Sequence, residues 1–302
     1  MHSIFKKAMK YVLNRDYRFL IHAGFGCYNR WDDERYLQKK FRAVMGRELN
    51  LDAPQTFNDK LQWLKLYDRK PEYTMMVDKY AVRAYIAEKL GDQYLIPLLG
   101  VWENPDDIDF DALPDQFVLK CNHNSGLGMC ICRDKSKLNY DKVRKELRKG
   151  LAQDYYLTGR EWPYKNVPRK IICEKFMTDE SGTELKDYKV MCFGGEPYLI
   201  QIHRGRFGSH TQDFYDSAWN KLQIVQGGTP MSDIYLEKPV FLDEMLDLSR
   251  ILSAGLPQVR VDWYYANNQL YFGELTFFDA SGYDDFYPDE VNYELGEKII
   301  LP

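Results

Sequence analysis

Several features that would place this chain in other protein classes are missing from its sequence. No apolar run approaches the roughly 18 residues that a membrane-spanning helix needs, and no signal peptide is evident. The net charge is −4, so the positive excess typical of nucleic-acid-binding proteins is absent. The six cysteines include no Cys-x-x-Cys pair, which argues against zinc and disulfides. Most of them stand in apolar runs, as reduced thiols do, and we therefore expect a cytoplasmic protein.

Aromatic and β-branched residues are concentrated in residues 260–276, which we expect to form two antiparallel strands. With a three-residue loop at 267–269, Asp262 lies opposite Glu274. Two carboxylates about 5 Å apart across a ladder repel each other, and Mg²⁺ is the usual neutraliser because it binds carboxylate and phosphate oxygens. Arg260 shares the face of Asp262, since side chains alternate along a strand. On this motif alone, a salt-bridged surface hairpin is an equally open interpretation.

A second motif is a loop of glycine and small polar residues between two short apolar runs. The first run ends in Lys120, the loop covers residues 121–128, and the second run covers residues 129–132. Backbone N–H groups of such a loop can cradle phosphate oxygens, and the lysine adds a positive charge. No Gly-Lys-Ser/Thr sequence closes the loop, so it is not a Walker loop. An ordinary hairpin turn is the alternative.

Two further strand patterns lie between these motifs. Residues 170–177 form an apolar run that ends in charge, and residues 187–204 form two β-rich runs around Gly194-Gly195. A Gly-Gly pair in this setting predicts a tight hairpin turn.

The order of these parts resembles the ATP-grasp nucleotide-binding fold. Short phrases are similar to those of D-alanine–D-alanine ligases and, more specifically, to the TupA-like ATP-grasp family, which is named for teichuronopeptide biosynthesis. The phrases are Phe57-Asn58-Asp59-Lys60-Leu61-Gln62-Trp63, Asp78-Lys79-Tyr80-Ala81-Val82-Arg83, Arg160-Glu161-Trp162-Pro163-Tyr164, Asp187-Tyr188-Lys189 and Gly273-Glu274-Leu275-Thr276-Phe277. The resemblance implies an α+β fold of two lobes with the nucleotide between them, preceded by a helical N-terminal region.

The resemblance also implies an ATP site. Lys79 and Lys120 would contact the phosphates of ATP. The loop residues that would fold over these phosphates are Asn124, Ser125, Gly126 and Gly128. The residues that would surround the nucleoside are Glu174, Lys175 and Met177 at the adenine and Asp187 at the ribose.

For the chemistry, the resemblance implies that Asp262 and Glu274 hold Mg²⁺. Arg260 and Lys120 would stabilise the transferring phosphoryl group, because phosphoryl transfer depends on positioning and on neutralisation of charge. Many ATP-grasp enzymes have Asn as a third metal ligand two residues after the Glu, and here Thr276 occupies that position. A Thr hydroxyl can bind Mg²⁺ directly or through water, so the number of metal ions stays open.

The implied reaction is an ATP- and Mg²⁺-dependent ligation in which a carboxylate becomes an acyl phosphate and an amine then displaces phosphate. We expect a sugar or glycan precursor of the cell envelope as one substrate and an amino acid as the other, and no nucleic acid. Candidate substrate residues are Arg204 and Arg206 for an anionic acceptor and Ser281 and Gly282 for the carboxylate. The alternatives are a glycosyltransferase with a metal at Asp106-Asp107 or Asp284-Asp285, and an ATP-binding phosphotransferase or non-ligase module.

The N-terminal part has a different character. We expect residues 1–75 to be mostly helical and residues 76–302 to form the ATP-grasp-like catalytic domain. Residues 1–20 are basic and mildly amphipathic, with apolar positions Ile4, Phe5, Met9, Val12 and Leu13. We expect this helix to pack on its own protein, and weak peripheral contact with the inner face of the membrane is the alternative.

Overall fold

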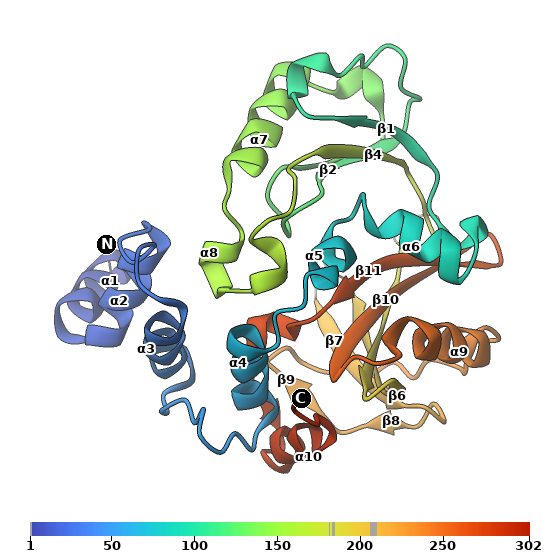
Figure 1. Ribbon diagram of the computed structural model, residues 1–302. Helices are drawn as coiled ribbons and strands as arrows, with labels where there is room; N and C mark the ends of the chain where they lie inside the picture. The colour runs from blue at the N-terminus through green and yellow to red at the C-terminus, as the bar shows by residue number, and fades with distance from the viewer. Residues whose placement is uncertain (1, 181, 183–184, 206–209) are drawn as a thin grey trace.

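Two antiparallel sheets form the centre of the computed structural model, which describes residues 2–180, 182, 185–205 and 210–302 (Figure 1). The smaller sheet has the strand order β1-β4-β2-β3, and the larger has the order β11-β10-β5-β6-β7-β8. The strands of the smaller sheet are β1 (Leu98–Trp102), β2 (Phe117–Cys121), β3 (Met129–Cys132) and β4 (Ile171–Lys175). Those of the larger sheet are β5 (Asp187–Phe193), β6 (Glu196–Arg204), β7 (Thr211–Asp216), β8 (Lys221–Leu222), β10 (Gln258–Ala266) and β11 (Gln269–Thr276).

Strand β2 shows how the smaller sheet is built into a lobe. Its side chains alternate between the two faces of the sheet, as in any strand. Phe117 and Leu119 are fully buried and share a core with Leu147 of helix α7 (Tyr140–Ala152). Val118 and Lys120 point to the other face, where they line a cavity together with residues of the larger sheet.

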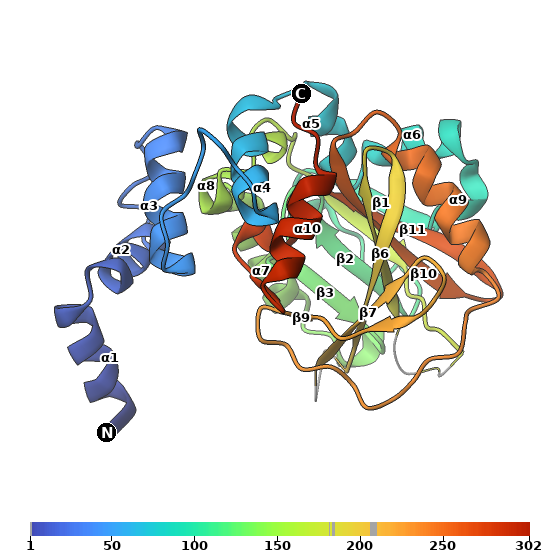
Figure 2. The same ribbon diagram turned by 90° about the horizontal axis from the view of Figure 1, so that it is seen from below.

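Helix α9 (Leu242–Ser253) covers one face of the larger sheet. Trp263 of β10 is fully buried, and its Nε1 donates a hydrogen bond to Ser249 Oγ of α9 at 2.8 Å. Because side chains alternate, Asp262 and Tyr264 point to the opposite face, toward the cavity. Helices α4 (Phe57–Tyr67) and α10 (Glu290–Lys298) pack against each other beside this sheet and complete its core (Figure 2).

The N-terminal helices divide into two groups. Helices α1 (His2–Leu13), α2 (Arg15–Gly24) and α3 (Asp33–Met45) stand to one side of the molecule (Figures 1 and 2). Their small core contains Phe19, Leu37 and Phe41. By contrast, α4 and α5 (Glu72–Val77) add Phe57 and Tyr73 to the core of the larger lobe. The mostly helical character of residues 1–75 is as expected, whereas the domain boundary at residue 75 stays a prediction.

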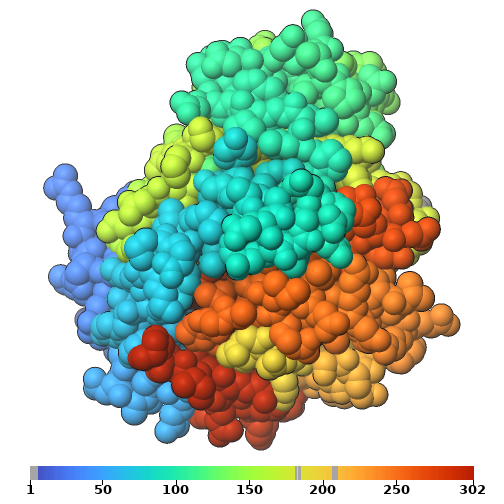
Figure 3. All heavy atoms as spheres, turned by 45° about the vertical axis from the view of Figure 1, so that its right-hand side comes forward, coloured from blue at the N-terminus to red at the C-terminus, as the bar shows by residue number. Residues whose placement is uncertain are grey.

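Shorter elements connect these parts. They are α6 (Val82–Lys89), α8 (Tyr156–Gly159), the strand pair β9 (Val225–Gln226) and β12 (Phe286–Tyr287), and the 3-10 turns η1 (Asp92–Tyr94), η2 (Pro105–Asp107), η3 (Lys135–Lys137), η4 (Trp162–Tyr164) and η5 (Asp279–Gly282). On the face seen in Figure 3, the teal segment around α6 lies between the smaller lobe and the larger one. Among the residues that the structure describes, none of the helices combines the length and apolar composition needed to cross a bilayer.

Candidate active site

A cavity of about 390 Å³ lies between the two sheets. Its walls come from β2, β3 and β4 of the smaller sheet, from β5, β10 and β11 of the larger one, and from the loop between β2 and β3. The predicted site residues in these walls are Lys79, Lys120, Asn124, Ser125, Gly126, Glu174, Lys175, Met177, Asp187, Asp262 and Glu274. The structure therefore brings together most of the residues that were predicted to bind nucleotide and metal, and their individual roles stay predictions.

One end of the cavity is apolar. Ile96 and Met177 form a small core with Ala266, and Leu185 and Tyr264 pack against it. Four of these side chains, those of Ile96, Met177, Leu185 and Tyr264, also line the cavity. Ligand pockets with apolar walls suit planar, poorly solvated groups. This end has the surface that an adenine ring would need.

Two lysines lie at the charged end of the cavity. Lys79 Nζ lies 3.3 Å from Glu274 Oε2 and donates a hydrogen bond to the backbone oxygen of Asn124 at 3.0 Å. Lys120 Nζ lies 2.7 Å from Glu174 Oε2. Both ammonium groups are therefore fixed by carboxylates at the cavity wall. They are placed where the oxygens of a bound phosphate could contact them.

The carboxylate of Glu174 is engaged with cations rather than free for the adenine. It accepts from Lys120 and also from Arg83, whose Nη1 lies 3.3 Å from Glu174 Oε1. The next residue, Lys175, donates its backbone N–H to the Pro97 oxygen at 2.9 Å. Glu174 thus orients Lys120, and its predicted contact with adenine remains a prediction.

The predicted phosphate loop is anchored at its first residues. Asn122 is buried, and its Nδ2 donates to Asp78 Oδ1 at 2.7 Å. Its Oδ1 accepts the backbone N–H of Lys170, also at 2.7 Å. Asn124 points inward as well, since its Nδ2 donates to the Gly150 oxygen at 3.1 Å. The side chain of Asn124 is therefore structural, and its backbone is the part that faces Lys79.

The glycines of the loop have different surroundings. Gly128 has a φ of +72°, and an added Cβ would lie 2.7 Å from Cys121 Sγ and 2.8 Å from Gly150 Cα. Close packing against α7 therefore requires glycine here, and Gly128 is not part of the cavity wall. Gly126 also has a positive φ, of +81°, but an added Cβ would meet nothing within 4 Å. Ser125 and Gly126 form the exposed tip that lines the cavity.

The turn of the C-terminal hairpin differs from the prediction. It has two residues, Asn267 and Asn268, where three were expected. Their φ values are +52° and +58°. Positive φ at both central residues is the type I′ geometry, which matches the twist of the flanking strands.

A bulge in the same hairpin restores the predicted pairing of carboxylates. Trp263 pairs with Phe272, but the next pair is Asp262 with Glu274. Gly273 is therefore the extra residue of β11. An added Cβ at Gly273 would lie 3.0 Å from the backbone oxygen of Asp262. The expectation that Asp262 lies opposite Glu274 is correct, although the geometry that produces it was not foreseen.

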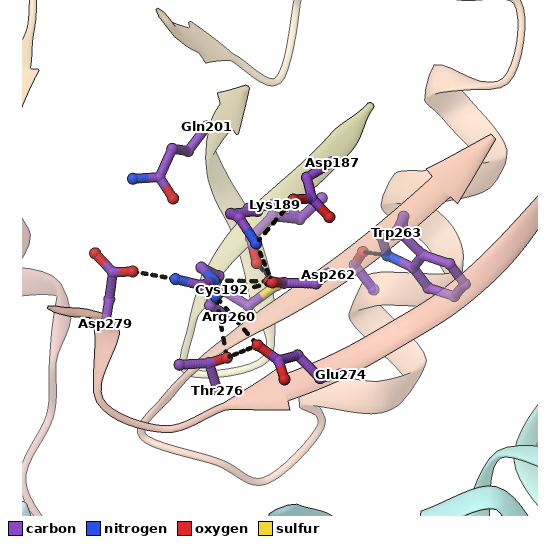
Figure 4. Close-up of polar contacts among 12 residues, drawn as sticks. Asp187, Lys189, Cys192, Gln201, Arg260, Asp262, Trp263, Glu274, Thr276 and Asp279 are labelled. Carbon is purple, nitrogen blue, oxygen red and sulfur yellow. Dashed lines mark hydrogen bonds and ion pairs between the residues drawn. The ribbon is translucent and has the colours of Figure 1, made fainter. Parts of the chain in front are cut away.

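Arg260 occupies the centre of the charged group next to the cavity (Figure 4). Its Nε and Nη2 donate to the two oxygens of Asp262 at 2.7 and 2.8 Å, and its Nη1 pairs with Asp279. Nη2 also donates to Thr276 Oγ1 at 3.1 Å and lies 3.7 Å from Glu274. Burial alone would lower the Arg260 pKa, but the two aspartates outweigh burial and raise it. Arg260 is thus a buried cation that positions the carboxylates, and it does not line the cavity.

Lys189 completes the site and was not among the predicted site residues. It is buried in the cavity wall, paired with Asp262, and its Nζ lies 3.9 Å from Asp187. Strand alternation could have revealed it, because Asp187 and Lys189 are two residues apart and share a face. Asp279 was missed as well, since it follows the strand without a local pattern.

The donor set can be tested for its fit to Mg²⁺. Glu274 is the more accessible carboxylate, with 34% of its side chain exposed. Asp262 receives three donors, two from Arg260 and one from Lys189, and a carboxylate has about four lone-pair sites. One oxygen from each carboxylate, with phosphate and water oxygens, is a usual Mg²⁺ environment. Within the described part of the chain no third His, Cys, Asp or Glu joins them as a metal-binding group.

The protonation state of Glu274 also suits a metal ligand. Burial would raise its pKa, but Lys79, Lys189 and Arg260 outweigh burial and lower the pKa to about 2. Glu274 is therefore ionised at neutral pH. Thr276 Oγ1 lies 3.4 Å from Glu274 Oε1 and also accepts from Arg260. In this arrangement Thr276 orients Glu274, and its role as a metal ligand stays a prediction.

Ser281 and Gly282 lie in turn η5, outside the cavity wall. Their φ values are +54° and +65°, and α4 holds them in this conformation. Lys65 Nζ donates to the backbone oxygen and Oγ of Ser281 at 2.8 and 3.0 Å, and Gln62 Nε2 donates to the Gly282 oxygen at 2.9 Å. Lys65 is fully buried, and burial lowers its pKa to about 7 although the buried Glu161 opposes this. The predicted contact with a carboxylate substrate stays a prediction.

The structure places Arg204 away from the cavity. On β6, His203 pairs with Asp187 of the cavity face, so Arg204 points to the opposite face. Its Nη2 lies 3.3 Å from Asp213 Oδ2 and donates to Ser232 Oγ at 3.0 Å. The structure gives no support to Arg204 as a substrate ligand, and Arg206 lies outside the described residues.

With this geometry in place, the comparison with protein families decides the assignment. Residues 59–300 match the family described as TupA-like ATPgrasp. The chain belongs to this family. The predicted ATP-grasp fold and family are therefore confirmed. No curated protein sequence matched the chain.

Several solved structures are similar to the chain at low sequence identity and with low TM-scores. D-alanine–D-alanine ligase from Bacillus anthracis, complexed with ATP, is 17% identical, with a TM-score of 0.40 over 67% of this chain and 55% of that one. The enzyme from Helicobacter pylori is 17% identical, with a TM-score of 0.42 over 81% and 69%. N5-carboxyaminoimidazole ribonucleotide synthetase from Thermus thermophilus is 10% identical, with a TM-score of 0.38 over 80% and 52%. Likeness at this level carries no argument about fold or substrates, and the assignment rests on the family match.

Proposed function

We propose that this ATP-grasp protein is an ATP- and Mg²⁺-dependent ligase that joins a carboxylate to an amine. The observation that carries the proposal is the cavity between the sheets. One end is apolar, and the other combines Lys79 and Lys120 with the paired carboxylates of Asp262 and Glu274. Membership of the TupA-like ATP-grasp family supports the same reading.

The proposed reaction has two steps. A substrate carboxylate oxygen attacks the γ-phosphorus of ATP, the bond to the β-phosphate oxygen breaks, and ADP leaves. The amine then attacks the acyl carbon, the bond between that carbon and the phosphate oxygen breaks, and inorganic phosphate leaves as the amine loses a proton. Lys79 and Lys120 would bind and orient the phosphates, which is the main contribution of a protein to phosphoryl transfer. When bound at Asp262 and Glu274, Mg²⁺ would neutralise phosphate charge.

Arg260 would act through other residues rather than on the phosphoryl group directly. It is nearly fully buried and bonded to Asp262, Asp279 and Thr276. It would hold Asp262 in one orientation, because a guanidinium binds a carboxylate with two parallel hydrogen bonds.

The substrates we propose are an amino acid and a sugar acid or amino sugar of a cell-envelope glycan. The support is membership of the TupA-like ATP-grasp family, because the sequence resemblance to that family implies teichuronopeptide biosynthesis as the context. The glycosyltransferase alternative gains nothing from the structure. Asp106 of its first candidate metal site pairs with Arg144 and Arg148 on α7 and does not line the cavity. Neither Asp284 nor Asp285 lines the cavity.

The test is a trapping experiment. The protein would be incubated with ATP, Mg²⁺, hydroxylamine and panels of amino acids or uronic acids, and hydroxamate and phosphate would be measured. An acyl phosphate reacts with hydroxylamine, so both products should appear only with the correct carboxylate. Phosphate release without any carboxylate would favour a phosphatase-like or phosphotransferase activity, and turnover of a nucleotide-sugar instead would favour the glycosyltransferase.

A variant of Glu274 links this activity to the site. Glu274→Gln should lower turnover by about 10²–10³-fold, the usual cost of removing one electrostatic contact to the transition state, while the variant stays folded with a lower unfolding temperature because Lys79 loses its charged partner. Glu290→Gln is the matched control, because Glu290 is exposed and outside the cavity. Full turnover in Glu274→Gln would remove the carboxylate pair from the mechanism.

A further inference from the structure

Helix α1 leaves apolar side chains uncovered. Val12 and Leu13 follow Met9 by three and four residues, so all three lie on one side of the helix. They expose 51%, 68% and 73% of their surface. Phe25, just after α2, is 81% exposed. The main contact of α1 is with α2, and Figure 2 shows it standing away from both lobes. The expected packing of this helix on its own protein is thus found chiefly against α2.

Several polar contacts hold α1 on α2. Arg18 Nη1 donates to the Tyr11 oxygen at 2.9 Å, and the Tyr11 hydroxyl lies 2.7 Å from His22 Nε2. Asn14, between the helices, caps α2 by accepting the backbone N–H of Tyr17 at 2.9 Å. These bonds orient α1 and leave Met9, Val12 and Leu13 exposed. The side of α1 that carries Met9, Val12 and Leu13 therefore has a defined orientation relative to α2.

The charge on α1 is of one sign. Lys6, Lys7 and Lys10 are all exposed, Arg15 follows them, and the first 15 residues contain no Asp or Glu. Apolar side chains flanked by lysines, on a helix too short to span a bilayer, are the pattern of helices that lie in the interface of an anionic membrane. A groove in a protein partner would need no such excess of lysine.

We propose that α1 docks on an anionic lipid surface, with Met9, Val12 and Leu13 inserted among the headgroups and the lysines contacting lipid phosphates. The lobes would stay in water, tethered through α2 and α3. Binding by one short helix should be weak and reversible, and it should weaken as salt screens the lysines. This proposal stands independently of the ligase reaction.

The test is co-sedimentation of the full chain with vesicles. We expect binding to vesicles of phosphatidylglycerol and phosphatidylcholine, and little binding to phosphatidylcholine alone. The double variant Val12→Asp/Leu13→Asp should lower the partition coefficient at least about tenfold, because two apolar side chains lose their insertion. Val240→Asp is the matched control, since Val240 is 93% exposed and lies outside α1. Equal unfolding temperatures would show that both proteins are folded.

Three results would overturn the proposal. The first is equal binding to neutral and anionic vesicles, and the second is unchanged binding of the double variant. The third is concentration-dependent self-association of the parent that disappears in the double variant, because it would show that the apolar side docks on a second copy of the chain. Loss of binding on reversal of charge, in Lys6→Glu/Lys7→Glu, would support the proposal.

Discussion

Arg260 is the residue that connects the charged groups of the site, since it bonds to Asp262, Asp279 and Thr276. Asp262 and Asp279 are both almost fully buried, and the guanidinium of Arg260 bonds to each of them. Without Arg260, both buried carboxylates would lose a positive charge that neutralises them. A buried charge that loses its partner costs far more than a surface charge that does, because water cannot replace the partner.

We therefore expect Arg260→Gln to lower the free energy of unfolding by about 3–5 kcal/mol. Arg250→Gln should lower it by about 1 kcal/mol or less, since Arg250 pairs with Glu196 and Asp247 at the surface, with 46% of its side chain exposed. Urea unfolding of both variants measures the two changes. Similar losses in the two variants would contradict the central role assigned to Arg260.

Lys65 should make stability depend on pH. Burial lowers its pKa from 10.5 to about 7 in the folded chain. Between these pH values the unfolded chain binds more protons than the folded one, so the free energy of unfolding rises with pH. Relative to Lys65→Met, the parent should gain stability from pH 7 to pH 10. Parallel stability curves for the two proteins would show that the Lys65 pKa is not lowered.

Two residues of the site, Lys189 and Asp279, escaped prediction. Lys189 stands two positions after Asp187 and could have been found from strand alternation. Asp279 could not, because its contact with Arg260 depends on how the chain turns after β11. Arg260, Asp262 and Glu274 were found because the hairpin brings them together locally.

At the level of elements, the C-terminal hairpin shows what a sequence pattern can and cannot determine. The two strands and the facing carboxylates follow from alternation and turn residues. The two-residue turn and the bulge at Gly273 could not be predicted from the sequence, because a three-residue loop without a bulge gives the same pairing of Asp262 with Glu274.

The glycines of the β2–β3 loop provide a matched pair of substitutions. Gly126→Ala should cost about 1–2 kcal/mol, because alanine disfavours a positive φ and an added Cβ meets nothing nearby. Gly128→Ala has the same backbone cost and also pushes against Gly150 on α7, which should add about 1–3 kcal/mol. Thermal unfolding should rank Gly128→Ala as clearly less stable. The reverse order would contradict the packing of this loop on α7.

At the scale of the whole molecule, the position of the cavity follows from how two sheets are covered. Helix α7 covers the outer face of the smaller sheet and α9 the outer face of the larger one. The polar residues of β2, β5, β10 and β11 lie on the inner faces of the two sheets and line the cavity between them. The two-lobe fold was predicted from the order of motifs. The position of α1 away from the two lobes was not predicted, because an amphipathic pattern does not show which surface covers the apolar side of the helix.

The central claim is that this inner space binds ATP with Mg²⁺, and calorimetric titration with a non-hydrolysable ATP analogue tests it most directly. We expect micromolar binding that tightens with Mg²⁺. Lys120→Ala should weaken it by about 10–100-fold, the cost of one charge-assisted contact, and Lys137→Ala should not, since Lys137 is 82% exposed. Absence of binding, or binding indifferent to both Mg²⁺ and Lys120, would contradict the account.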